Sequence, residues 1–176
     1  MRNGELEYFG EEVSQLQHAH QSYQLALSEG ADMELRVAAF LHDIGHMIGE
    51  DSDQYDVADH DAVGACWLHK AGFSDRVVAV VVQHVNAKRF LCCRFPAYYQ
   101  KLSEASKKTL EKQGGVMTPE QADDFEQLPY FGDIVRVRQW DERAKDKNLI
   151  ETNFKDIFDE INTVLNSANK TVEPLA

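Results

Sequence analysis

Helix start and stop signals recur along the whole chain and leave little room for other secondary structure. Gly30 and Gly72 follow segments with apolar residues at helical spacing, and glycine commonly ends a helix. Ser74 is a typical N-cap, and residues 118–121 (Thr-Pro-Glu-Gln) combine an N-cap, proline at the first helical position and glutamine at the third. The valine run at 77–82 would also suit a strand, but no neighbouring segment could pair with it. The sequence therefore predicts an all-α fold.

The length of 176 residues suits one compact domain and is short for two. The segment from Glu50 to Asp59, rich in aspartate, is expected to be a loop. We expect one helical bundle domain over residues 1–176, with its core at about 8–145, a C-terminal helix at about 153–165 and a ragged tail. The other predicted helices cover residues 11–29, 33–41, 60–71, 74–84, 96–113 with a break near Ser103, and 133–144, with a further helix starting at Thr118.

The formal net charge of −12 argues against a polyanionic partner, because such a chain repels a phosphate backbone. We expect a small-molecule substrate, no nucleic acid and no membrane, and leave protein partners open. Neither a signal peptide nor a run of about eighteen apolar residues is visible. Cys66, Cys92 and Cys93 are odd in number, which argues against a disulfide framework and favours buried thiols in a cytoplasmic protein.

The adjacent pair His42 and Asp43 is the most informative chemical feature. Neighbours at a helix end can both point into one cavity where the backbone turns, and Gly45 permits such a turn. A carboxylate there could bridge two cations, while histidines from other helices complete each site. Three further histidines lie on or at the edge of predicted helices: His18, His60 and His84. Imidazole together with carboxylate suits iron, manganese or zinc.

Helical geometry sorts the neighbouring residues by face. Glu11 and His18 share one face of the first predicted helix, so Glu11 points toward whatever His18 binds. His20 and His69 are rotated by roughly half a turn from the nearest candidate ligands on their helices. We expect these two histidines to face solvent or internal packing.

Lys88 lies four residues beyond His84, which places a cation near the metal pocket if the helix continues that far. A fixed positive charge beside two metal ions is a natural anchor for a phosphate or phosphonate. Spacing alone fits a solvated surface lysine equally well. Arg138 stands one turn before Asp141, and an ion pair on the helix surface would account for it.

Several motifs resemble a known family. The order of the histidines and aspartates resembles the HD-domain superfamily, in the subset whose additional histidines hold two metal ions. The more specific motifs are Tyr8-Phe9-Gly10-Glu11, Ser14-Gln15-Leu16-Gln17-His18, His84-Val85-Asn86-Ala87-Lys88-Arg89, Leu102-Ser103-Glu104-Ala105-Ser106 and Arg138-Gln139-Trp140-Asp141. Over about residues 8–145 they resemble the mixed-valent diiron oxygenases that use dioxygen to cleave carbon–phosphorus bonds.

The resemblance implies two iron ions, Fe(II) and Fe(III) in the active form, with Asp43 bridging between them. The ligands that it implies are His18, His42, Asp43 and Asp141 for one ion, and Asp43, His60 and His84 for the other. It implies catalytic positions at Tyr8, Glu11 and His46, with Tyr8 and Glu11 closing over the site. The substrate contacts that it implies are Glu11 for the amine, and His46, Lys88 and Ser106 for the rest of the substrate and its phosphonate.

The substrate that the resemblance implies is (R)-2-amino-1-hydroxyethylphosphonate, cleaved to glycine and phosphate in phosphonate catabolism. The same chemistry on the N-trimethyl analogue, giving glycine betaine, stays open, because Tyr8 and Phe9 offer aromatic faces to such a cation. A metal-dependent HD phosphohydrolase acting on a phosphate ester would need the same His42 and Asp43 pair. An inositol-type diiron oxygenase and a sensory module that binds a structural ion are further alternatives.

Overall fold

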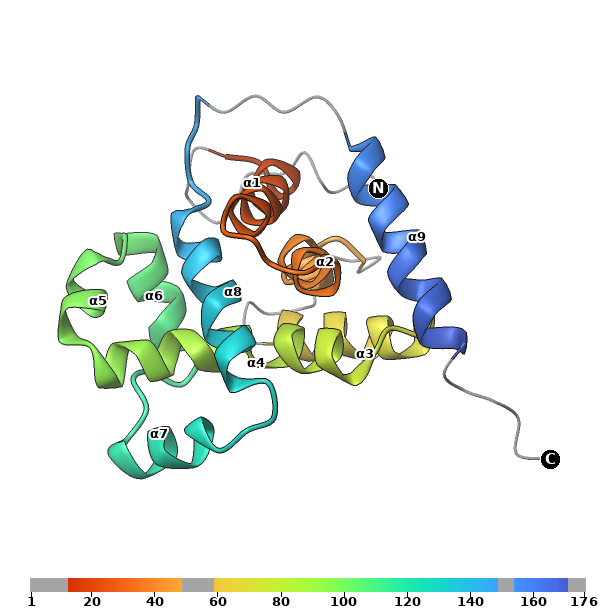
Figure 1. Ribbon diagram of the computed structural model, residues 1–176. Coiled ribbons are helices and arrows are strands. Elements are labelled where there is room, and N and C mark those ends of the chain that lie inside the picture. The colour runs from red at the N-terminus through yellow and green to blue at the C-terminus, as the bar shows by residue number, and fades with distance from the viewer. Residues whose placement is uncertain (1–12, 49–58, 149–153, 171–176) are drawn as a thin grey trace.

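The computed structural model describes residues 13–48, 59–148 and 154–170, and the regular elements within these ranges are helices (Figure 1). The helices are α1 Gln15–Ser28, α2 Met33–Leu41, the short 3₁₀ helix η1 Ile44–His46, α3 His60–Ala71, α4 Asp75–Arg94, α5 Pro96–Lys101, α6 Glu104–Lys112, α7 Pro119–Glu126, α8 Phe131–Arg143 and α9 Lys155–Lys170. The prediction of an all-α fold is confirmed.

Side-chain caps fix many of the helix ends. The hydroxyls of Ser74 and Thr118 each accept a hydrogen bond from a backbone N–H in the first turn of α4 and α7. The side chain of Gln121 accepts a hydrogen bond from the backbone N–H of Thr118 and completes a capping box. Gly72 ends α3 with a φ of 89°, a left-handed conformation that favours glycine.

Helices α1, α2, α3, α4 and α8 form the centre of the structure. Helix α4 packs against both α3 and α8, while α1 packs against α2 and α8. Figure 1 shows α5, α6 and α7 together at one end, beyond α8, and α9 on the opposite side along α2. The fully buried side chains at the centre include Leu35, Leu68, Val77, Val80, Ile134 and Trp140.

A few predicted boundaries were wrong. Helix α8 begins at Phe131 rather than at residue 133, directly after Tyr130, which has a φ of 62° and makes no side-chain cap. Helix α9 covers Lys155–Lys170 rather than 153–165. Of the thiols that were expected to be buried, Cys92 is buried but Cys66 is exposed.

No helix in the described ranges is both long and apolar enough to cross a bilayer. The loop expected from Glu50 to Asp59 falls, apart from Asp59, outside the described residues.

Candidate metal centre

Six side chains from five parts of the chain meet between the central helices. Helices α1, α3, α4 and α8 each supply one of them, and the turn that follows α2 supplies two. None of the six residues is more than 4% exposed. They are His18, His42, Asp43, His60, His84 and Asp141.

Gly45 lets the start of α3 approach the turn after α2. A Cβ atom at Gly45 would lie 1.9 Å from the backbone oxygen of His60, and one at Gly64 would lie 3.1 Å from the backbone nitrogen of Gly45. The backbone turns here as expected, but Gly45 is not among the glycines with a positive φ, so the turn needs no left-handed residue. Its missing side chain permits the close packing that brings His60 beside Asp43.

His18, His42 and Asp141 form one group with an oxygen of Asp43. The Nε2 atoms of His18 and His42 lie 3.1 Å apart. Oδ1 of Asp141 lies 3.3 Å from Nε2 of His18. Oδ2 of Asp43 lies 3.4 Å from Nε2 of His42. Two imidazoles and two carboxylates therefore converge on one small volume.

His60 and His84 form a second group on the other side of Asp43. Their Nε2 atoms lie 3.0 Å apart. Oδ1 of Asp43 lies 3.4 Å from Nε2 of His60 and 3.2 Å from Nε2 of His84. The two oxygens of one carboxylate are thus divided between two pairs of histidines.

Backbone carbonyls set the direction of three of these rings. The Nδ1 atoms of His18, His42 and His84 lie 2.7 to 2.9 Å from the carbonyl oxygens of Ala144, Ala39 and Val81. A carbonyl only accepts, so each Nδ1 carries a hydrogen and each Nε2 faces inward, as a lone pair when the ring is neutral and as an N–H toward the carboxylates when the ring is protonated. Two facing lone pairs need a positive charge between them, either a proton or a metal ion. The donor set of imidazole and carboxylate fits a divalent transition metal.

The carboxylates are ionised and ready for a cation. Burial raises the pKa of Asp43, but the charge of His42 and hydrogen bonds from His42, His60 and His84 hold it well below its usual range. Burial also raises the pKa of Asp141. The charge of Arg138 and a hydrogen bond from His18 outweigh this effect and hold the pKa of Asp141 well below its usual range.

His46 lies beside the second group. Its ring stacks on that of His60 with centroids 4.0 Å apart. Ligand atoms of Asp43, His46 and His60 all lie within 4.8 Å of one another. Burial and the charge of His60 lower the pKa of His46 to about 3, so this ring is neutral at physiological pH.

Lys88 and Arg138 place positive charge next to the first group. Lys88 is 4% exposed, and its Nζ donates to Oγ1 of Thr109 at 3.1 Å. Burial, with the charge of Arg138, lowers the pKa of Lys88 to about 7. Arg138 was expected to form an ion pair on the helix surface. It does pair with Asp141 and Glu142, to which it donates hydrogen bonds, but it is buried rather than exposed.

Ser106 stands at the edge of the same network. Its hydroxyl accepts a hydrogen bond from Nζ of Lys145 at 3.0 Å, and Lys145 also donates to Oε1 of Glu142 at 3.0 Å. Thr109 donates to the backbone oxygen of Ser106. Sequence reasoning missed Thr109 and Lys145. The spacing of three residues between Ser106 and Thr109 was a usable signal, whereas nothing local singled out Lys145.

Two of the predicted site residues, Tyr8 and Glu11, lie outside the described residues. His20 is buried and its ring packs against those of Tyr23 and Phe154, as expected for a residue off the metal face. His69 is exposed, which also agrees with its exclusion.

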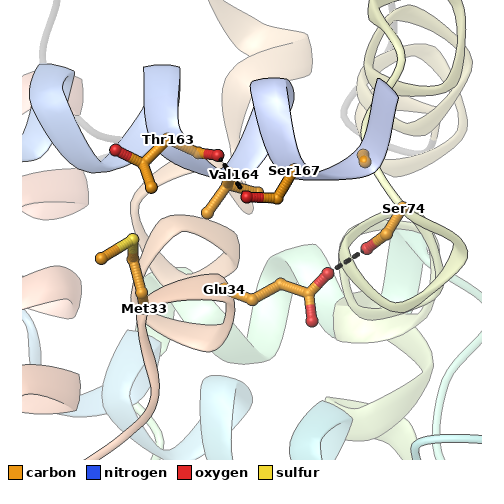
Figure 2. Close-up of a pocket in the computed structure, with 7 residues that line it drawn as sticks. Met33, Glu34, Ser74, Thr163, Val164 and Ser167 are labelled. Atoms are coloured by element: carbon orange, nitrogen blue, oxygen red, sulfur yellow. Dashed lines mark hydrogen bonds between the residues drawn. The ribbon is translucent and has the colours of Figure 1, made fainter. Parts of the chain in front are cut away.

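A separate hollow lies between α2, the start of α4 and α9 (Figure 2). It has a volume of about 370 Å³, and Glu34 at its wall accepts a hydrogen bond from the Ser74 hydroxyl. Arg76 donates to the same carboxylate at 3.1 Å. These hydrogen bonds satisfy the carboxylate of Glu34 in the wall of the hollow. Among the described residues, the groups that could hold a metal ion lie at the histidines and not at this hollow.

Comparison with known proteins finds one family match and relatives that share one type of named activity. Residues 15–121 match the HD domain family. The chain is 37% identical over 163 residues to a hydroxymethylphosphonate dioxygenase of Gimesia maris, covering 90% of this chain and 81% of the relative. It is 38% identical over 148 residues to a [1-hydroxy-2-(trimethylamino)ethyl]phosphonate dioxygenase (glycine-betaine-forming) of Leisingera caerulea, covering 82% of this chain and 75% of the relative.

Proposed function

The chain belongs to the HD-domain family and resembles its phosphonate dioxygenases, and we propose that it is a cytoplasmic oxygenase that cleaves the carbon–phosphorus bond of a 1-hydroxyphosphonate. The observation that carries this proposal is the carboxylate of Asp43, whose two oxygens face two separate pairs of histidines. One bridging carboxylate between two nitrogen-rich groups is how helical bundles build dinuclear sites.

The two ions that we propose are iron. His18, His42, Asp43 and Asp141 would hold one, and Asp43, His60 and His84 the other. Bound iron would supply Lewis acidity toward the substrate oxygens and electron exchange with dioxygen. The chain itself fixes the ligand geometry, because backbone carbonyls hold the rings of His18, His42 and His84 in place.

The anionic end of the substrate is assigned to the side with Lys88 and Ser106. Lys88 is buried and close enough to Asp43 and Asp141 for their charges to act on its pKa. A phosphonate placed there would hold Lys88 in its charged form, since a nearby anion favours the ammonium. His46, neutral beside His60, would offer a hydrogen bond without adding charge.

The substrate that we propose first is (R)-2-amino-1-hydroxyethylphosphonate. Its conversion balances with one dioxygen: the carbon fragment gains one oxygen atom and leaves as glycine, and the phosphorus gains the other and leaves as phosphate. Glu11 is proposed to receive the primary ammonium through a charge-assisted hydrogen bond, with Tyr8 beside it.

The activities named for the two bacterial relatives favour two further substrates. Hydroxymethylphosphonate has no nitrogen at all, and the N-trimethyl compound has no N–H to give to Glu11. The three compounds share a hydroxyl on the carbon that is bonded to phosphorus. They differ in the substituent on that carbon, which carries an amine, a trimethylammonium group or no nitrogen. They therefore separate the common chemistry from the recognition of the nitrogen group.

The test is phosphate release from these three compounds by iron-loaded protein, with and without dioxygen. We expect oxygen-dependent phosphate together with one glycine per phosphate from the amine compound. Preference for the trimethyl or the hydroxymethyl compound would keep the chemistry and replace the substrate. Replacement of Asp43 by alanine should abolish the release, while His69→Ala, at an exposed position, should leave it intact.

Phosphate release that needs no dioxygen would overturn the proposal. It would point to the phosphohydrolase chemistry that HD domains also support, in which a metal-bound hydroxide attacks a phosphate ester. A parallel assay with simple phosphate monoesters detects this outcome directly.

A further inference from the structure

The segment that follows α8 is attached to α1 at two points. The backbone oxygen of Ala144 accepts from Nδ1 of His18 at 2.9 Å. The amide of Gln21, one turn further along α1, donates to the backbone oxygen of Asp146 and accepts from its backbone nitrogen, both at 2.9 Å. Gln21 is 4% exposed and Ala144 is fully buried, whereas Asp146 is exposed, so the first attachment is buried and the second is partly buried.

We propose that Gln21 is a positioning residue for the metal centre, acting through residues 144–146 on His18 and on Lys145. This inference rests on the proposed function, because it takes His18 as a metal ligand and Lys145 as part of the anion site. Gln21 itself reaches neither group of ligands. It makes its two hydrogen bonds to the backbone of Asp146.

Helix α8 holds only the start of this segment, through the N–H of Ala144, which donates to the oxygen of Asp141 at 3.2 Å, and this is why the amide of Gln21 matters. The helix ends at Arg143, and Lys145 donates its backbone N–H only as far back as the oxygen of Arg143. The position of the Ala144 carbonyl therefore depends on the residues beyond it as well as on the end of α8. A two-point bond from one planar amide fixes the backbone of Asp146 in both position and rotation, and so fixes the acceptor for His18 two residues earlier.

The same segment also carries Lys145 between its two attachment points. The amine of Lys145 donates to Oγ of Ser106 and to Oε1 of Glu142. A shift of residues 144–146 would therefore move the acceptor of His18 and the amine beside Ser106 together. Gln21 thus links the metal side of the site to its anionic side.

The experiment measures binding of Fe(II) to the full chain without dioxygen, and binding of inorganic phosphate to the iron-loaded protein. In Gln21→Ala we expect one of two Fe(II) ions to bind more weakly, by up to the roughly tenfold to hundredfold that loss of the outer partner of a metal-binding histidine costs, since the carbonyl of Ala144 is displaced rather than removed. Phosphate should bind more weakly as well. Lys145→Met should weaken phosphate alone and keep both ions.

Gln24→Ala, at an exposed position one turn further along α1, is the matched control and should behave as the wild type. Gln21→Glu keeps the acceptor for the backbone N–H of Asp146 and loses the donor. It should also weaken Fe(II) binding, because a carboxylate oxygen then faces the carbonyl oxygen of Asp146, and it carries the test if Gln21→Ala does not fold. Two ions bound with wild-type affinity by both Gln21 variants would overturn the inference. A wild-type chain that binds no Fe(II) would instead overturn the proposed function beneath it.

Discussion

At the scale of single residues, Asp43 organises the site by position as much as by charge. It lies in the turn after α2, so its carboxylate can stand between its neighbour His42 and the histidines of α1, α3 and α4. Oδ2 faces His42, whereas Oδ1 faces His60 and His84. Loss of a ligand on one side should therefore leave the other side largely intact.

His84→Ala tests this independence of the two sides. The substitution removes one of the two nitrogens beside Oδ1 of Asp43, so we expect one metal ion per chain in place of two, measured by elemental analysis after dialysis. His69→Ala, an exposed histidine in the last turn of α3, should keep both ions. Complete loss of metal from His84→Ala would show that the two sites do not bind separately.

Lys88 gives the stability of the protein a defined dependence on pH. Burial, with the charge of Arg138, lowers its pKa from 10.5 to about 7. Between these values the unfolded chain holds a proton that the folded protein has released, so this group makes the free energy of unfolding rise with pH. The rise is at most about 1.4 kcal/mol per pH unit, and the cost of the buried amine is greatest below the folded pKa.

Lys88→Met should remove this part of the slope. Urea unfolding of both proteins at several pH values between about 7 and 9 measures it, and the difference in stability between wild type and variant should shift in favour of the wild type as pH rises. Lys101→Met, at the exposed end of α5, should follow the wild-type curve. Parallel curves for wild type and Lys88→Met would contradict the assignment.

At the scale of elements, the sequence was most informative where a helix end depends on local side chains. The bounds of α2 and α3 were predicted correctly, and Gly72 marks the end of α3 in both sequence and structure. The start of α8 was missed because Tyr130 makes no side-chain cap. That Gly45 and Gly64 bring two helical segments together was not predictable, because it depends on packing between distant residues.

Gly45→Ala tests that packing. The added Cβ would meet the backbone oxygen of His60, which cannot rotate away, so η1 and the start of α3 must separate. We expect a loss of stability of about 1–3 kcal/mol and weaker metal binding on the side of His60. Gly132→Ala is the matched control, because nothing lies within 4 Å of its Cβ and alanine favours the helix by up to about 1 kcal/mol.

At the scale of the whole molecule, the metal centre joins α1, α3, α4, α8 and the turn after α2. Helix α9 lies on the far side of α2 (Figure 1), and its described side chains are not among the candidate ligands. It is held by apolar packing, including Ile157, which is 1% exposed, and by an ion pair between Arg36 and Glu160. Metal binding and α9 should therefore stabilise the fold independently.

Removal of the metal ions should lower the melting temperature, because ions that bind only the folded chain stabilise it. We expect the melting temperature, measured by calorimetry, to fall by roughly 10 °C when a chelator is added. Ile157→Ala should lower the melting temperature by a similar amount in both the presence and the absence of metal, while it keeps both ions. A chelator effect that disappears in Ile157→Ala would show that the two contributions are coupled.

Anomalous diffraction at the iron absorption edge, from crystals of iron-loaded protein, tests the central claim most directly. We predict two peaks, one among His18, His42, Asp43 and Asp141 and one beside Asp43, His60 and His84, with one oxygen of Asp43 toward each. A single peak, or two peaks that do not share Asp43, would contradict the account of a carboxylate-bridged dinuclear centre.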